Sequence, residues 1–134
     1  MLLTARPLIN VANVNTWEYA DQVKFTQGDQ VLVYFQLIDA IKDTSLKMPG
    51  KRYVAASGAT LIATVNSIDI NKTYAKVATQ PFPGDLSIWQ IQILASDQCV
   101  GTLTIKLALL ESGLTTHGVI KNVLSIDPQS ASFI

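Results

Sequence analysis

The side chains that could perform chemistry are few in this 134-residue chain, and they lie far apart in the sequence. His117 is the only histidine, Cys99 is the only cysteine, and Glu18 and Glu111 are the only glutamates. General acid–base catalysis needs such groups held together near one substrate, and a metal site needs several ligands. No spacing in the sequence groups these residues. We therefore expect no catalytic residue, no metal site and no cofactor, and the chain is predicted not to be an enzyme.

The remaining short motifs that resemble reactive ones are predicted to be turns. Ser57-Gly58 and Ser112-Gly113 lack the flanking glycine pattern of a nucleophile elbow. Cys99 has no second cysteine for a disulfide, and His117 has no like partner for a metal cage. We expect both of these residues to be dispensable.

The balance of charge excludes several classes of partner. Ten Lys and Arg residues face ten Asp and Glu residues, so the net charge of zero leaves no basic surface for nucleic acid. No apolar run approaches the roughly 18 residues that cross a membrane, and Arg6 and Pro7 interrupt the N-terminal apolar run too early for a signal peptide. Only 15% of the residues are charged, against about 25% in an average domain. Weakly charged proteins associate readily, which favours a subunit of an assembly, and the early interruption of the N-terminal apolar run favours a protein made in the cytoplasm.

The aromatic residues leave a second function open. They could form a platform for sugars, although aromatic residues in β domains more often belong to the core and to strand pairs. A carbohydrate-binding or adhesin-like module is favoured if Trp17, Tyr53 and Tyr74 line one exposed groove. A small-ligand barrel is a further alternative, and it would need a continuous internal cavity.

The pattern of apolar residues predicts an all-β chain. Short runs rich in β-branched and aromatic residues are separated by Gly, Pro, Asn and Asp, and no run keeps a helical apolar stripe for three turns. Val31–Ile38 is apolar on both faces, as in a central strand covered on each side. Leu86–Leu94 and Thr102–Leu110 are predicted to form a hairpin with one apolar face, which needs a second sheet to cover it.

We expect an immunoglobulin-like β-sandwich of about seven or eight short antiparallel strands over residues 17–128. A small barrel is the alternative architecture. The core anchors are expected from the apolar faces of the predicted strands, and they are Phe35, Trp89, Ile91, Ile93, Leu103, Ile105 and Leu107.

Residues 1–16 precede this predicted sandwich, and residues 129–134 are expected to be a short C-terminal tail. The first segment carries an apolar set, Leu8, Ile9, Val11 and Val14, and one charge, Arg6. Because unpaired extended backbone recruits other chains, we expect this arm either to form an edge strand of its own sandwich or to add to a neighbouring subunit.

Four stretches together resemble a known family. They are VKFTQGDQVLVYFQL, ASGATLIATVNS, TQPFPGDLSIWQIQIL and CVGTLTIKLALLESGLTTHGVIKNVLSI, and they cover roughly residues 23–127. Their order of strands and Gly-Asp turns is similar to that of the immunoglobulin-like domain of the phage baseplate upper protein (BppU-like) family and related small virion proteins.

This resemblance implies a structural protein of a tailed-phage virion, in the neck, tail, baseplate or capsid decoration. The partners that it implies are other virion proteins, including copies of the chain itself, and neither nucleic acid nor a membrane. Two features depart from the family pattern: the stretch from Asp39 to Tyr53 is longer, and no fibre segment follows Pro128.

Overall fold

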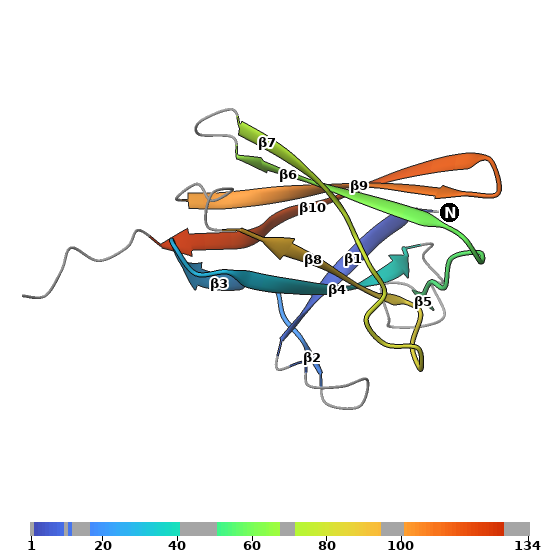
Figure 1. Ribbon diagram of the computed structural model, residues 1–134, viewed down its shortest axis with the longest axis horizontal. Coiled ribbons are helices and arrows are strands. Elements are labelled where there is room, and N and C mark those ends of the chain that lie inside the picture. The colour runs from blue at the N-terminus through green and yellow to red at the C-terminus, as the bar shows by residue number, and fades with distance from the viewer. Residues whose placement is uncertain are drawn as a thin grey trace, which may run out of the picture.

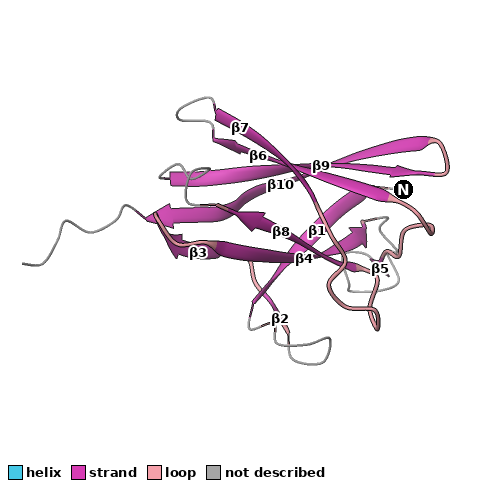
Figure 2. Ribbon diagram, viewed as in Figure 1, coloured by secondary structure: helices cyan, strands magenta, loops and turns pink. Residues whose placement is uncertain are grey.

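The computed structural model describes residues 2–9, 11, 17–40, 51–67, 72–94 and 101–127. Over these residues the chain is all-β, without helix, which confirms the predicted class (Figure 2). The strands are β1 (Leu3–Ile9), β2 (Glu18–Tyr19), β3 (Val23–Thr26), β4 (Val31–Asp39), β5 (Lys51–Arg52), β6 (Thr60–Ser67), β7 (Lys72–Val77), β8 (Ile88–Ile93), β9 (Gly101–Glu111) and β10 (Leu114–Asp127). Val14, Cys99 and residues 129–134 lie outside the described residues.

All ten strands belong to one hydrogen-bonded sheet that folds over into two layers (Figure 1). Its main path runs β5-β4-β1-β10-β9-β6-β7, while β2, β3 and β8 pair with β1, β10 and β4. We call β6, β7, β9 and β10 the β9 layer, and β1, β4 and β8 the β4 layer. An apolar sheet face must be covered by another layer, and here one sheet supplies both.

The predicted number of strands is wrong, and the predicted antiparallel pairing holds for all but two of the ladders in the described residues. The described residues contain ten strands instead of seven or eight, and β10 alone spans 14 residues. The two parallel pairings are those of β1 with β10 and of β3 with β10. Between Ile120 and Leu124 the register of β10 against β9 shifts, so three residues of β10 oppose one of β9. Such a bulge bends a strand, and β10 changes its neighbour from β1 to β3 across it.

The hairpin predicted from Leu86–Leu94 and Thr102–Leu110 is also wrong. Both segments form strands, but β8 pairs with β4, while β9 pairs with β6 on one side and with β10 on the other. No edge of β9 is left for β8 along these ladders. The observed hairpin joins β9 to β10 through Ser112-Gly113. Both turn residues have positive φ, 49° and 78°, as two-residue hairpins of the type I′ require.

The core lies between the two layers. Trp89, Ile91 and Ile93 of β8 and Phe35 of β4 face it from one side, and Leu103, Ile105 and Leu107 of β9 face it from the other. All of these residues are buried, as expected from the alternation of apolar residues in their strands. The apolar faces of β8 and β9 therefore meet across the core, although the strands are not paired.

The N-terminal segment is not a separate arm, and β1 is not an edge strand. It pairs with β4 from Leu3 to Leu8 and approaches β10 at Leu3, opposite Gly118. Leu3 and Ala5 belong to the core. Pro7 fits in this strand because its carbonyl accepts a hydrogen bond from Ala20 N, so the side of the residue that lacks an N–H faces away from β4. The boundary predicted at residue 16 therefore divides one folded unit.

A single bridge closes the two layers at their far edge. Thr79, just after β7, pairs with Gln90 of β8, through two backbone hydrogen bonds of 3.0 and 2.7 Å. Ala78, the preceding residue, still donates to Leu61 O in β6. From this bridge β7 stays with the β9 layer and β8 stays with the β4 layer (Figure 1).

The crossing of β1 over β10 depends on one residue, Gly118. A Cβ atom at position 118 would lie 2.2 Å from the carbonyl oxygen of Leu3, a distance at which the backbone must move. We predict that Gly118→Ala lowers the free energy of unfolding by about 3 kcal/mol, as strong overpacking does, and speeds hydrogen exchange in β1 more than in β9.

Urea unfolding and amide exchange measured by NMR test this prediction. Thr115→Ala, at an exposed position of the same strand, is the control and should stay within about 0.5 kcal/mol of the parent. A Gly118→Ala chain as stable as the parent would mean that β1 does not cross β10 here.

Candidate functional site

The four residues expected to form an apolar arm are not presented together on the surface. Leu8 is buried, where β1 pairs with β4 opposite Tyr34. Ile9 ends the strand and is partly exposed, and Val11 is half-buried. Val14 lies outside the described residues. These residues therefore do not form a free apolar strip for a neighbouring subunit.

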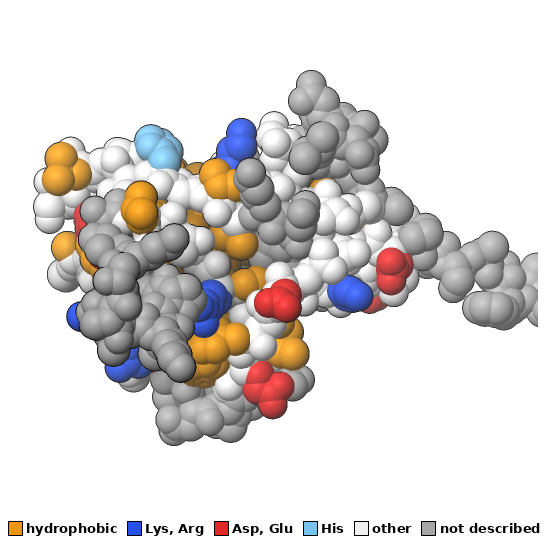
Figure 3. Space-filling view, turned by 180° about the vertical axis from the view of Figure 1, so that it is seen from behind, with side chains coloured by type: hydrophobic (Ala, Val, Ile, Leu, Met, Phe, Trp, Pro, Cys, Tyr) orange, Lys and Arg blue, Asp and Glu red, His pale blue; other side chains and the backbone are white. Residues whose placement is uncertain are grey.

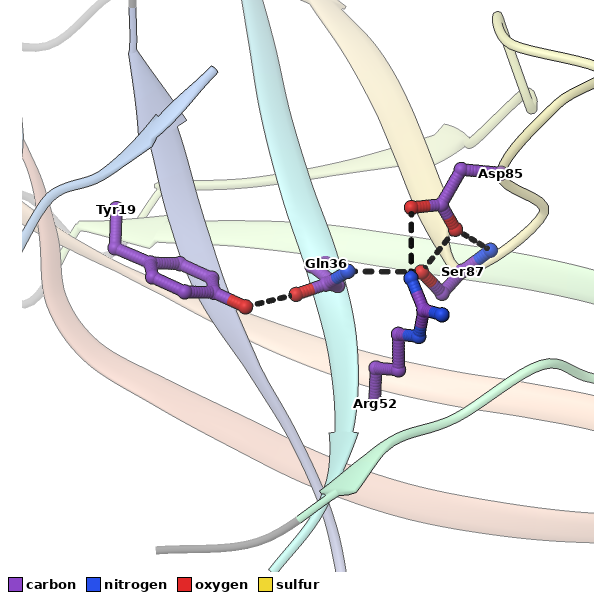
Figure 4. A network of polar contacts seen from close by, with 5 residues as sticks. All are labelled: Tyr19, Gln36, Arg52, Asp85 and Ser87. Atoms are coloured by element: carbon purple, nitrogen blue, oxygen red, sulfur yellow. Dashed lines mark hydrogen bonds and ion pairs between the residues drawn. The ribbon is translucent and has the colours of Figure 1, made fainter. Parts of the chain in front are cut away.

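A chain of polar side chains crosses the outer side of β4, away from the core (Figure 4). The hydroxyl of Tyr19 donates to Gln36 Oε1, and Gln36 Nε2 donates to Ser87 Oγ at 3.0 Å. The hydroxyl and the amide of Ser87 both donate to Asp85 Oδ1, and Arg52 Nη1 lies 3.6 Å from Asp85 Oδ2. The chain links β2, β4, the segment before β8 and β5.

The two central members of this polar chain are fully buried, and only its ends reach solvent. Gln36 and Ser87 are buried, whereas Arg52 is 67% exposed. A buried amide or hydroxyl without a partner costs about 1–3 kcal/mol, so each link holds its neighbours in one orientation. The one hydroxyl that donates to a carboxylate in this arrangement is that of Ser87, and it is fully buried, out of reach of a substrate. Its physical role is to fix the segments that cover β4.

Tyr19 borders a hollow of about 450 Å³ lined by Ala5, Arg6, Pro7, Tyr19, Ala20, Asp21 and Ile120. The guanidinium carbon of Arg6 lies 5.1 Å from the centre of the Tyr19 ring, and the Trp17 ring meets Tyr19 edge-on at 4.8 Å. A second hollow of about 300 Å³ lies at the other end of the polar chain, beside Arg52 and Asp85.

The aromatic residues that would favour carbohydrate binding do not line one groove. Trp17 contacts Tyr19, whose hydroxyl reaches Gln36 on the outer side of β4. Tyr53 and Tyr74 instead pack against the core between the layers. Side chains from both layers fill that core. A ligand-binding barrel would need its cavity in the same space.

The outer sides of the two layers differ in how they are covered. On the β4 layer, Phe82 stacks on Tyr34 at 6.1 Å, Tyr19 bonds to Gln36, and Ile38 and Ile88 are buried although they do not belong to the central core. This arrangement agrees with the expectation that β4 is covered on both faces. The β9 layer carries on its outer side a set of side chains that we call the outer sheet face. They are Thr60, Ile62, Thr64, Ala75, Val77, Lys106, Ala108, Leu110, Thr115, His117 and Val119.

The outer sheet face is apolar or hydroxylic and almost free of charge. Val77, Leu110 and Val119 are 68%, 40% and 45% exposed. Lys106 is the one Lys, Arg, Asp or Glu residue in the set that defines this face. Figure 3 shows the molecule from behind, with small separate hydrophobic patches and the histidine near its upper edge. Apolar sheet surface rimmed by polar residues is typical of protein contacts.

Tyr53 and Glu111 join the segment after β5 to the β9–β10 hairpin. The hydroxyl of Tyr53 donates to Glu111 Oε1, and Ala56 N donates to Glu111 Oε2 at 2.8 Å. The hydrogen bond to the carboxylate, with desolvation and the charge of Glu111 adding to it, raises the pKa of Tyr53 from 10.0 to about 12. The neutral phenol is therefore the form that the folded state stabilises.

His117, which was also considered for chemistry, lies on the outer sheet face. His117 is exposed on β10, opposite Ala108 of β9. Within the described ranges, no three His, Cys, Asp or Glu side chains come together as metal ligands do. No helix of the described structure has the length and hydropathy that a membrane span requires. No family model, curated protein or solved structure matches the chain.

Sequence reasoning did not single out Gln36 or the polar chain around it. The available signals were a glutamine inside the apolar run VLVYFQLI and the spacing of Asp85 and Ser87 after Pro83-Gly84. An Asp that accepts a hydrogen bond from the amide two residues later is a common turn, and the structure contains it. The link between Ser87 and Gln36 spans 51 residues and has no local signature.

Trp89 anchors the core but leaves one polar atom without a partner. Its Nε1 is buried and has no hydrogen-bond partner among the described residues. We predict that Trp89→Ala lowers the free energy of unfolding by about 3–5 kcal/mol, as truncations of large aromatic residues do. Trp89→Phe should cost only about 1 kcal/mol, because it keeps most of the apolar area and removes the unpaired N–H.

Urea unfolding of the two variants measures both values. Leu32→Ala, at a site that is 47% exposed on β4, is the control and should lie within about 0.5 kcal/mol of the parent. The placement of Trp89 is wrong if Trp89→Ala melts within a degree or two of the parent.

The Tyr53–Glu111 contact predicts a stability that falls at high pH. The folded state keeps the phenolic proton up to a pKa of about 12, whereas an unfolded tyrosine loses it near 10.0. The stabilisation is thus fully present below pH 10 and is lost as the pH rises through 12. The free energy of unfolding, measured in urea at successive pH values in this window, should fall more steeply for the parent than for Tyr53→Phe. Parallel curves would contradict the contact.

Proposed function

We propose that this chain is a non-enzymatic structural subunit of a tailed-phage virion, in the neck, the tail or baseplate, or the capsid decoration. It binds neighbouring virion proteins, copies of itself among them, and uses neither nucleic acid nor a membrane as a partner. It is made in the host cytoplasm and ends in the virion. The observation that carries the contact role is the outer sheet face.

The asymmetry between the layers supports this role. The outer side of the β4 layer is covered by the chain's own segments, such as Phe82 over Tyr34. The outer sheet face keeps Val77, Leu110 and Val119 exposed in a protein whose net charge is zero. A nearly uncharged sheet surface loses little hydration on contact and repels a neighbouring subunit weakly.

The virion assignment rests on the sequence resemblance together with the all-β architecture. We propose that the two layers form a variant of the immunoglobulin-like sandwich, since two packed sheet layers over one core are its defining arrangement. Two features depart from the usual form: β1 and β3 pair with β10 in parallel, and the layers are hydrogen-bonded into one sheet.

Particle incorporation tests the proposed function. An epitope-tagged chain, expressed in the host during phage production, should be found in gradient-purified particles by mass spectrometry. The variant Leu110→Asp with Val119→Asp should keep the melting temperature of the parent, because both sites are exposed. Its occupancy in particles should fall at least about tenfold, since burying two carboxylates costs well over 1.4 kcal/mol.

Leu32→Asp, on the β4 layer, is the matched control and should be incorporated like the parent. Particles that lack the parent chain would overturn the proposed function. Equal incorporation of the parent and the double variant would overturn the use of the outer sheet face.

A further inference from the structure

The exposed edge of β7 is the place where the outer sheet face ends without a neighbouring strand. β7 pairs with β6 along one side, from Lys72 to Val77. Backbone hydrogen-bonding groups in a strand alternate between its two sides. Ala78 N points to β6, and Thr79 N points the other way, to Gln90 of β8. By this alternation, the N–H and C=O groups of Thr73, Ala75 and Val77 all point away from β6.

These outward-pointing backbone groups meet no strand in the described part of the chain. The ladders of β7 contain only β6, and the pairing with β8 is confined to the single bridge at Thr79. The side chains of Thr73, Ala75 and Val77 are all exposed. Natural edge strands are commonly protected by charged side chains, proline or a covering loop. β7 carries Lys72 and Lys76, but the residues whose backbone groups point outward are Thr73, Ala75 and Val77, small side chains that are compatible with strand addition.

We propose that β7 pairs with β7 of a second copy of this chain, antiparallel and centred on Ala75. This inference rests on the contact role proposed above and names one partner and one edge for it. A two-fold axis at Ala75 places Thr73 opposite Val77 of the second copy, and Ala75 opposite itself. Every outward-pointing group of these three residues then has a partner, since directly opposed residues of this kind exchange both of their hydrogen bonds.

The same register suits the side chains on both sides of the strand. On the outer side it sets the methyl groups of Val77 against Thr73, and it makes the two outer sheet faces continuous. On the core side it sets Lys76 opposite Tyr74 of the second copy, which avoids the repulsion of lysine opposite lysine. A zero net charge on each copy adds no long-range repulsion. An isologous contact of this kind closes on itself as a dimer.

Cysteine cross-linking in a Cys99→Ser background tests the register. Directly opposed residues have Cα atoms about 5.5 Å apart, within the range of about 4.4–6.8 Å that a disulfide spans. Ala75→Cys should therefore form a disulfide-linked dimer with itself under mild oxidation. Thr73→Cys should not, because the two copies of residue 73 would be roughly 13 Å apart along the strand. A mixture of Thr73→Cys and Val77→Cys chains should form the mixed dimer.

The oligomeric state is measured by size-exclusion chromatography with light scattering. The parent should reach twice its monomer mass of 14.6 kDa as its concentration rises. Ala75→Pro removes an N–H that faces away from β6, so it should keep the fold and shift the dimer midpoint at least about tenfold to higher concentration, because it removes hydrogen bonds on both sides of the axis. Thr115→Lys, on the outer sheet face but away from this edge, should dimerise like the parent.

The outcomes separate this inference from the proposed function. A parent chain that stays monomeric at all concentrations and yet enters particles overturns the self-pairing and keeps the structural role. A dimer whose Thr73→Cys chains cross-link with themselves while Ala75→Cys chains do not overturns the register. A dimer with the expected cross-links, in a chain absent from particles, supports the inference and overturns the proposed virion role.

Discussion

The position of β1 between β4 and β10 is the constraint on which the rest of the structure depends. It joins the β4 layer to the β9 layer, so that one sheet can form both sides of the core. The crossing is possible only where the backbone of Leu3 can approach Gly118, at which a Cβ atom would clash. Leu3 and Ala5 then fill the core, and Pro7 turns its missing N–H away from β4.

The two layers differ because the chain covers one of them and not the other. The polar chain from Tyr19 through Gln36 and Ser87 to Asp85 holds segments from β2 and from before β8 against the outer side of β4. A buried amide keeps such segments in place because its hydrogen bonds are lost if they move. The outer sheet face of the β9 layer, in contrast, remains exposed.

An exposed, weakly charged sheet with an open edge is a physical reason to associate, and it fits a protein in which no catalytic grouping was found among the described residues. Because β7 and β8 meet only at the bridge between Thr79 and Gln90, the sheet does not close into a complete barrel along β7. As a result the β7 edge stays available beside the outer sheet face. The proposed contact with neighbouring subunits and the proposed pairing of β7 are two uses of this continuous surface.

The sequence by itself determined the β class and the buried faces, because the alternation of residues such as Trp89, Ile91 and Ile93 is local and follows from the geometry of a strand. It also determined the turns at Ser112-Gly113 and Pro83-Gly84, where the residue types favour particular dihedral angles. Only the tertiary structure decided which strands pair. The apolar faces of β8 and β9 suit a hairpin and opposite layers equally well, since hydrophobic burial has no direction. The place of β1 likewise depended on Gly118, more than a hundred residues away, and the polar chain depended on a contact between Gln36 and Ser87 that no local pattern encodes.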